Sequence, residues 1–189
     1  MTKNRYILVR KFINFRTRVL FSLFNKNLEN LVQVGGDSAV DECMWRFEGQ
    51  SRYVITMPRK PTETGIRGFL HCFKLSNSGR PCCRRVIPDV RFPMLTGTQV
   101  IENCWNHVPG DLGISITADS WFASIPWLFS HPEYPTTFAM AGNDFYSFLE
   151  LFSNELVHKE YRVFSKSNVL ISIWLDEKLV LTASNAHAL

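Results

Sequence analysis

Three apolar runs separated by short polar segments lie near the C-terminal end of the chain, and this pattern constrains the fold most strongly. The runs are Tyr161–Ser165, Val169–Leu175 and Leu179–Ser184, and the segments between them are Lys166-Ser167-Asn168 and Asp176-Glu177-Lys178. Short runs rich in β-branched and aromatic residues, bounded by turn-forming residues, are typical of β-strands. The pattern predicts a β-meander and excludes an all-helical fold.

The residues before the meander alternate between strand-like and helix-like patterns. Strands are predicted over Ala39–Phe47, Ile66–Leu75, Arg80–Phe92, Leu112–Ala118 and Thr136–Ala141, and helices over residues 6–33, Thr98–Val108, Ile125–Phe129 and Asp144–Leu156. Thr96 or Thr98 is the expected N-cap of the second helical segment. This order of elements predicts a mixed α/β domain whose sheet contains both antiparallel and parallel pairs.

The positive charge of the chain is concentrated in residues 1–26. This segment holds seven Lys and Arg residues and no acidic residue, whereas the rest of the chain holds 14 basic and 17 acidic residues. Such a segment can contact nucleic-acid phosphates, but it is also typical of a solvated helix face or an Arg-rich mitochondrial presequence. Gly35-Gly36-Asp37 interrupts the helical pattern. We therefore predict a basic helical arm over 1–37 and a domain over 38–189, and expect 1–26 to be removable without loss of the fold.

Composition narrows the class of protein further. A hydrophobic fraction of 46% and a charged fraction of 20% are those of a globular protein, and no apolar run approaches the roughly 20 residues that span a bilayer. With no secretory signal, we expect a soluble, intracellular protein. The five cysteines are Cys43, Cys72, Cys82, Cys83 and Cys104. Their odd number and the absence of a Cys-x-x-Cys pair predict reduced thiols and no zinc site.

Two aspartates have positions that are unusual for carboxylates. Asp41 lies inside the first predicted strand, and Asp119 directly follows the Ile-rich strand 112–118. Burying a carboxylate without a partner is costly, but at the end of a strand it can reach a metal or substrate. Taken alone, each aspartate is more often a cap or turn residue than a ligand, and Asp119 could N-cap the next helix. These positions alone leave the two interpretations open.

Three different short blocks of residues follow one another along the chain. The first block comprises Asp41-Glu42, Phe47-Glu48-Gly49, Pro58-Arg59-Lys60-Pro61 and Gly65-Ile66, the second Asp119, Phe122, Ser124, Pro126 and Leu128, and the third Trp174, Asp176, Lys178, Val180 and His187. In this order, the stretch from Ser38 to His187 resembles the catalytic domain of piggyBac-type DNA transposases. Each block is short, so the order of all three carries the resemblance.

The resemblance implies an RNase H-like mixed sheet of the DDE transposase type. In such enzymes three carboxylates hold two divalent metal ions, Mg²⁺ or Mn²⁺. By motif, Asp41 and Asp119 correspond to the first and second catalytic, metal-binding aspartates, and we expect them to lie close together on neighbouring strands. Glu42 follows Asp41 on a strand, so its side chain should face the opposite side of the sheet and should not be a ligand.

Several departures from the family pattern predict a loss of activity. In the family, the third catalytic aspartate follows the Trp-to-His hairpin, whereas no carboxylate follows Glu177 here. Asp176 falls in the hairpin turn, where a structural role is expected. The loop 139–148 lacks the family's positive charge, and Gln50 and Ser120 replace the usual Arg and Asn. The Cys-rich zinc module of many members is also absent. A degenerate or truncated transposase domain is therefore predicted.

Three hypotheses about function follow from these observations. The favoured one is a piggyBac-derived remnant that is inactive in transposition and is at most a DNA- or protein-binding domain. The others are an active nuclease fragment completed in trans, and a protein-interaction module that uses exposed aromatic residues. The predicted DNA-binding residues are Arg10, Lys11, Arg16, Arg18 and Lys60. Expected partners are weakly and non-specifically bound DNA, and a second copy or a related transposase, but no membrane. The expected location is the nucleus, with the mitochondrion or cytoplasm as alternatives.

Overall fold

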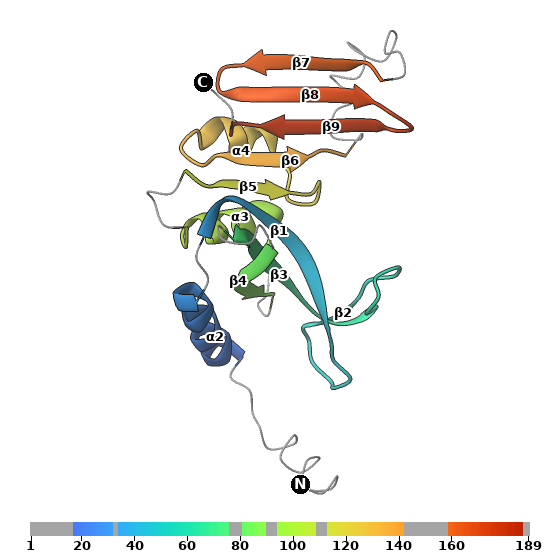
Figure 1. Cartoon of the computed structure of the whole chain (residues 1–189). Coiled ribbons are helices and arrows are strands. Elements are labelled where there is room, and N and C mark those ends of the chain that lie inside the picture. Colours follow the sequence, from blue (N-terminus) through green and yellow to red (C-terminus); the bar gives the residue numbers. More distant parts are fainter. Residues whose placement is uncertain are drawn as a thin grey trace, which may run out of the picture.

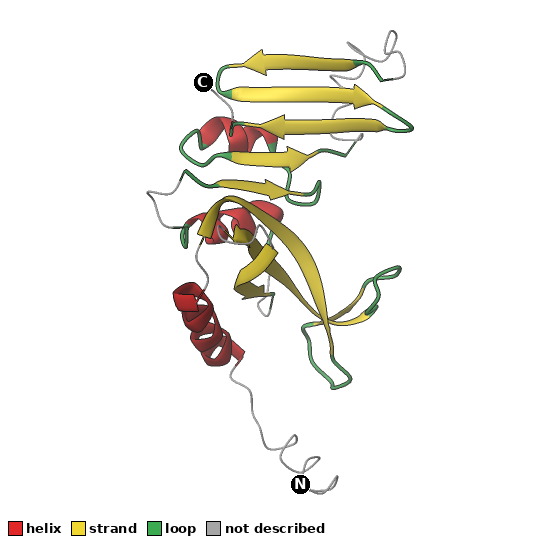
Figure 2. Ribbon diagram, in the orientation of Figure 1, coloured by secondary structure: helices red, strands yellow, loops and turns green. Residues whose placement is uncertain are grey.

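The computed structural model describes residues 17–31, 34–75, 81–89, 94–108, 113–141 and 159–186, which form a mixed sheet with helices beside it (Figure 1). The strands are β1 (Val34–Arg46), β2 (Val54–Thr56), β3 (Thr64–Leu75), β4 (Pro81–Pro88), β5 (Ser115–Ala118), β6 (Thr136–Ala139), β7 (Tyr161–Lys166), β8 (Val169–Leu175) and β9 (Leu179–Ser184). The helices are α2 (Thr17–Leu31), α3 (Gly97–Trp105) and α4 (Ile125–Ser130). Figure 2 shows that strands dominate the described chain.

The sheet contains both kinds of strand pairing, as the sequence predicted. Its order is β2-β3-β1-β5-β6-β9-β8-β7, and β4 also pairs with β3. β1 is antiparallel to β3 but parallel to β5, and β5 is parallel to β6. The pair of β6 with β9 is antiparallel, and so are the pairs of the β7–β8–β9 meander. The prediction of a mixed α/β domain with a C-terminal meander is therefore confirmed. The short β2 was not predicted.

β1 begins earlier than the sequence suggested. Its first residue is Val34 rather than Ala39, so the strand runs across the predicted boundary after residue 37. The pairing with β3 shifts register between Val34 and Ser38, which is where Gly35 and Gly36 lie. A glycine inside a strand often marks such an irregularity, because it has no side chain to pack and tolerates unusual backbone angles. The glycine pair therefore lies within a strand, at a register shift.

One hydrophobic core lies between the sheet and the helices α3 and α4. It joins residues of β1, β3, β5, β6, β8 and β9 with Val100, Ile101, Cys104 and Trp105 of α3 and with Trp127 and Leu128 of α4. The predicted N-cap Thr96 is confirmed, because its hydroxyl accepts a hydrogen bond from Gln99 N and the Gln99 side chain accepts from Thr96 N. Such a capping box satisfies two backbone donors of the first turn.

α2 is attached to the edge of the sheet formed by β4. Within the predicted helical stretch 6–33, α2 covers Thr17–Leu31, and residues 6–16 lie outside the described part. The amide of Asn25 donates to Val86 O at 2.8 Å and accepts from Val86 N at 2.8 Å. The side chain thus satisfies backbone groups that an edge strand otherwise leaves open. α2 therefore contacts the sheet through Asn25, and the removal of residues 1–26 without loss of the fold stays a prediction.

Two further predicted elements are a helix after β6 and the turn between β8 and β9. The predicted helix Asp144–Leu156 lies outside the described residues. The hairpin turn containing Asp176 is confirmed, because Asp176 N donates to Lys178 O at 3.2 Å between β8 and β9. None of the helices in the described part of the chain has the length and apolar character needed to cross a bilayer.

Candidate metal site

The parallel pairing of β1 with β5 brings Asp41 and Asp119 together. The paired positions end at Val40 opposite Ala118, and the next residue on each strand is one of the two aspartates. Neighbouring strands lie about 4.8 Å apart, so residues at matching positions of a parallel pair are adjacent. The structure therefore places the two aspartates at neighbouring positions of β1 and the end of β5, although 77 residues separate them along the chain.

Both aspartates face away from α3 and α4. Val40 and Ala118 are buried in the core, and side chains alternate along a strand, so the residues that follow them point to the opposite face of the sheet. Asp41 and Asp119 are accordingly exposed. Their carboxylates can therefore meet a ligand that approaches the sheet from the side opposite α3 and α4.

Glu42 lies on the core-facing side of β1, opposite in direction to Asp41. Its side chain is only 9% exposed, and its Oε1 lies 3.2 Å from Lys60 Nζ. Oε1 has no hydrogen bond of good geometry among the described residues, so the nearby ammonium is its main compensation. This placement agrees with the expectation that Glu42 is not a ligand beside Asp41. It also means that the predicted DNA-binding residue Lys60 already has an acidic partner.

Local backbone hydrogen bonds orient each aspartate. Asp41 Oδ1 accepts from Glu42 N at 2.7 Å, and Asp119 Oδ1 accepts from Trp121 N at 2.9 Å. Asp119 therefore holds a turn and does not cap α4, whose N-cap is Ser124. Within the described residues, Oδ2 of each aspartate has no hydrogen-bond partner, so each carboxylate keeps one oxygen for a ligand.

A buried polar network fastens the strands that carry the aspartates. Ser38 Oγ of β1 donates to Ser115 O of β5 at 2.9 Å and lies 3.0 Å from His71 Nε2 of β3. Because the hydroxyl proton of Ser38 is directed to Ser115, His71 Nε2 must be the donor in the second bond. Burial lowers the pKa of His71 to about 3, so the ring is neutral near pH 7. The sequence analysis missed this network, although polar residues inside apolar strands were the available signal.

The turn that contains Asp119 rests on a second cluster. The ring of Trp121 stacks on Phe69 with 5.2 Å between centroids, and the Arg67 guanidinium lies 5.0 Å from the centre of the Trp121 ring. Arg67 is in turn held by the buried carboxylate of Asp89, with 2.6 Å between Nη2 and Oδ2. Gly97, the first residue of α3, lies directly against the backbone of Trp121 and Phe122. Residues of β3 and α3, together with Asp89 just after β4, therefore support the turn that contains Asp119.

The other predicted site residues are the basic ones. Arg10, Lys11 and Arg16 lie outside the described residues, and Arg18 falls in the first turn of α2. Over the described ranges, no three His, Cys, Asp or Glu side chains come close enough to hold a metal ion together. The site as described thus consists of two carboxylates.

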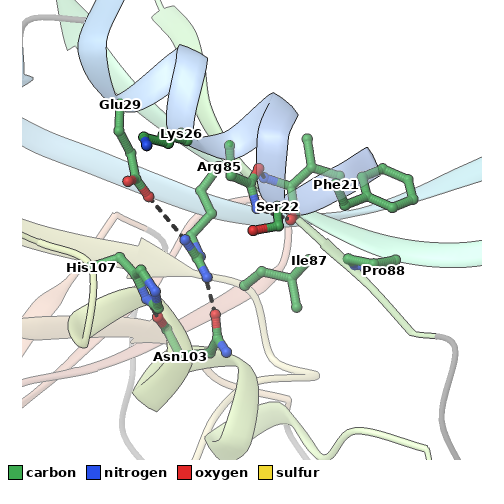
Figure 3. A pocket seen from close by; sticks show the side chains of 11 residues that line it. Phe21, Ser22, Lys26, Glu29, Arg85, Ile87, Pro88, Asn103 and His107 are labelled. Carbon is green, nitrogen blue, oxygen red and sulfur yellow. Dashed lines mark hydrogen bonds and ion pairs between the residues drawn. The ribbon is translucent and has the colours of Figure 1, made fainter. Parts of the chain in front are cut away.

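A separate polar hollow of about 450 Å³ lies between α2, β4 and α3 (Figure 3). Arg85 crosses it, donating from Nη1 to Glu29 Oε1 at 2.9 Å and from Nε to Asn103 Oδ1 at 3.1 Å. Figure 3 shows this side chain reaching from β4 between the two helices. The hollow does not include Asp41 or Asp119, and its polar contacts fasten α2 to α3.

Comparison with known proteins gives one informative similarity. No protein-family model matches the chain, and no curated protein matches it. A piggyBac transposase, determined by cryo-EM in a synaptic complex with hairpin DNA, superposes with a TM-score of 0.76 over 96% of this chain at 19% sequence identity. The chain spans 39% of the length of that transposase. In its fold, the chain is therefore similar to piggyBac transposase, as its sequence motifs indicated.

Proposed function

We propose that this chain is a piggyBac transposase-derived domain of RNase H-like fold, in which Asp41 and Asp119 form part of a divalent-metal site. The observation that supports the proposal most directly is the parallel register of β1 and β5, which makes the two aspartates neighbours. The similarity in fold to a piggyBac transposase, whose structure was determined in a synaptic complex with hairpin DNA, supports it independently.

The chemistry of the two aspartates suits Mg²⁺ or Mn²⁺. Both ions prefer hard oxygen ligands, and each aspartate has an oxygen with no hydrogen-bond partner within the described residues. Asp41 and Asp119 would hold the ion from adjacent strands, while Ser38 and His71 keep those strands together. The ion would supply positive charge to stabilise the charge that develops on a phosphodiester during cleavage.

We further propose that the domain does not cleave DNA by itself. In the resembled enzymes three carboxylates hold two metal ions, whereas two carboxylates are brought together in the described residues. A metal centre with fewer ligands is bound more weakly and positions the reacting groups less accurately. The role of this domain would then be the binding of DNA or of another protein.

Metal binding should depend on both aspartates. Replacing either Asp41 or Asp119 by Asn is expected to weaken Mn²⁺ binding at least about tenfold, since even changes around the ligands of a metal often cost that much. Calorimetry or paramagnetic relaxation would measure the affinity. Asp37→Asn is the matched control, because Asp37 lies on the same strand, is exposed and pairs with Lys74 instead. Equal affinities for all four proteins would rule out the site.

The same proteins test the proposed lack of cleavage. Incubation of the wild type with supercoiled plasmid and Mn²⁺ is expected to leave the plasmid uncut. Nicking that is present in the wild type and in Asp37→Asn but disappears in both Asp41→Asn and Asp119→Asn would show an active nuclease.

We propose that the basic N-terminal segment contributes most of the DNA affinity. Residues 1–26 hold seven basic residues and no acidic one, whereas acidic residues exceed basic ones in the remainder. Contacts between such residues and phosphates do not read the base sequence. They weaken steeply as the salt concentration rises, because the release of counterions from DNA then contributes less free energy to binding. We therefore propose weak, non-specific binding to DNA.

Removing the charge of the segment should remove this binding. We expect joint replacement of Arg10, Lys11, Arg16 and Arg18 by Gln to abolish retention on duplex DNA at about 50 mM salt and to flatten the salt dependence. Fluorescence anisotropy with labelled DNA would measure both. Substitution is preferable to deletion because residues 17–26 belong to α2. Lys60→Gln is a comparison with a smaller expected effect, since Lys60 is paired with Glu42. Unchanged binding by the fourfold variant would assign DNA contact to the domain.

A further inference from the structure

Three of the five cysteines lie on the adjacent strands β3 and β4. Cys72 of β3 is the direct cross-strand partner of Cys83, whereas Cys82 is opposite Phe73. Directly opposed residues in an antiparallel pair have Cα atoms about 4.5–5.5 Å apart, which is within the range that a disulfide requires. Neighbouring residues of a strand face opposite sides, so Cys82 points away from this pair. The register therefore selects Cys72 and Cys83.

The two thiols also lie within reach of each other. The Cys83 thiol donates to Arg85 O at 3.4 Å, and Cys83 is the cross-strand partner of Cys72. Both cysteines are free and only partly buried. A small thiol reagent can therefore approach the pair.

The thiols differ in their readiness to react. The interaction between the two thiols lowers the pKa of Cys72 to about 7 and raises the pKa of Cys83. Burial raises the pKa of Cys43 and of Cys104 to about 12. The thiolate is the reactive form in thiol–disulfide exchange, so Cys72 has more of its reactive form near neutral pH than Cys43 or Cys104.

We propose that Cys72 and Cys83 form a reversible cross-strand disulfide by exchange with a low-molecular-weight disulfide. The Cys72 thiolate attacks one sulfur of the reagent, whose S–S bond breaks and releases one thiolate. Cys83 then gives its proton to solvent and attacks the Cys72 sulfur, which releases the second thiolate. Two protein thiols are oxidised to one disulfide, and the reagent is reduced to two thiols.

The position of the pair gives the disulfide structural consequences. Cys72 lies two residues from Leu70, the cross-strand partner of Asp41, so the pair is on the same face of the sheet as the aspartates. Cys83 also lines an apolar hollow of about 670 Å³ beside α2, together with Leu70, Trp45 and Val86. A covalent link here would join β4 to β3 at the point where their register shifts. β4 is the strand to which α2 is hydrogen-bonded through Asn25.

Oxidation with glutathione disulfide tests the proposal. The wild type is expected to lose about 2 Da, the mass of two hydrogens, and to yield one crosslinked peptide that joins Cys72 to Cys83, which dithiothreitol reverses. Cys72→Ser and Cys83→Ser should not form this link, while the matched control Cys82→Ser should form it like the wild type. Alkylation of the reduced protein at pH 7 should label Cys72 before Cys43.

Other outcomes would overturn the proposal. These are a crosslink that involves Cys82 in place of Cys72 or Cys83, a stable mixed disulfide with glutathione on Cys72 without a second step, or no reaction. Peptide mapping of the wild type decides among them even if a serine variant does not fold.

Discussion

Replacement of Asp89 by Ala is expected to lower the free energy of unfolding by about 3–5 kcal/mol, because it leaves the charge of Arg67 without its partner in a buried position. The Asp89 side chain is fully buried, and Oδ2 accepts from Arg67 Nε at 3.0 Å and from Nη2 at 2.6 Å. Its Oδ1 accepts from Leu95 N at 3.0 Å. Urea unfolding followed by tryptophan fluorescence would measure the loss.

An exposed ion pair is the control for this prediction. Arg46 and Glu48 are 2.9 Å apart, but their side chains are 78% and 66% exposed. Glu48→Ala should therefore change the free energy of unfolding by less than about 1 kcal/mol. Because Arg67 also lies over Trp121, Asp89→Ala should additionally change the fluorescence of the native state. Equal stabilities for the two variants would show that the Asp89 carboxylate is not important to the fold.

Replacement of Gly97 by Ala is expected to destabilise the protein by about 1–3 kcal/mol, the cost of overpacking a close contact. In most helices the same change is stabilising by up to about 1 kcal/mol, so the prediction is one of sign. A Cβ atom at Gly97 would lie 2.6 Å from Phe122 Cα and 2.6 Å from Trp121 O. These are backbone atoms of the turn that contains Asp119, so either α3 or the turn must move.

The movement should be detectable at the candidate metal site. Gly97→Ala is expected to weaken Mn²⁺ binding as well as stability, because Asp119 would shift relative to Asp41. Gly36→Ala is the matched control, since a Cβ atom there would be 3.8 Å from Gly113 O, an ordinary van der Waals contact. A Gly97→Ala protein with unchanged stability and Mn²⁺ affinity would contradict this account of the turn.

Features that depend on residues close together in the sequence were predicted well. The meander strands, the N-cap at Thr96 (predicted as Thr96 or Thr98) and the turn at Asp176 each depend on a few neighbouring residues. Alternation along β1 was likewise sufficient to predict that Glu42 faces away from Asp41. The glycine pair was interpreted less well, because glycine is compatible both with the end of a helix and with an irregularity inside a strand.

Features that depend on distant segments were decided by the tertiary structure. The sequence by itself determined the mixed α/β class, the order of the motifs and the two aspartates with the chemistry of a metal ligand. Only the parallel register of β1 and β5 places those aspartates side by side, and only folding brings Arg67 to Asp89 or Asn25 to the edge of β4. The physical reason is that such contacts are favourable only after burial removes polar groups from water, so no local pattern encodes their partners.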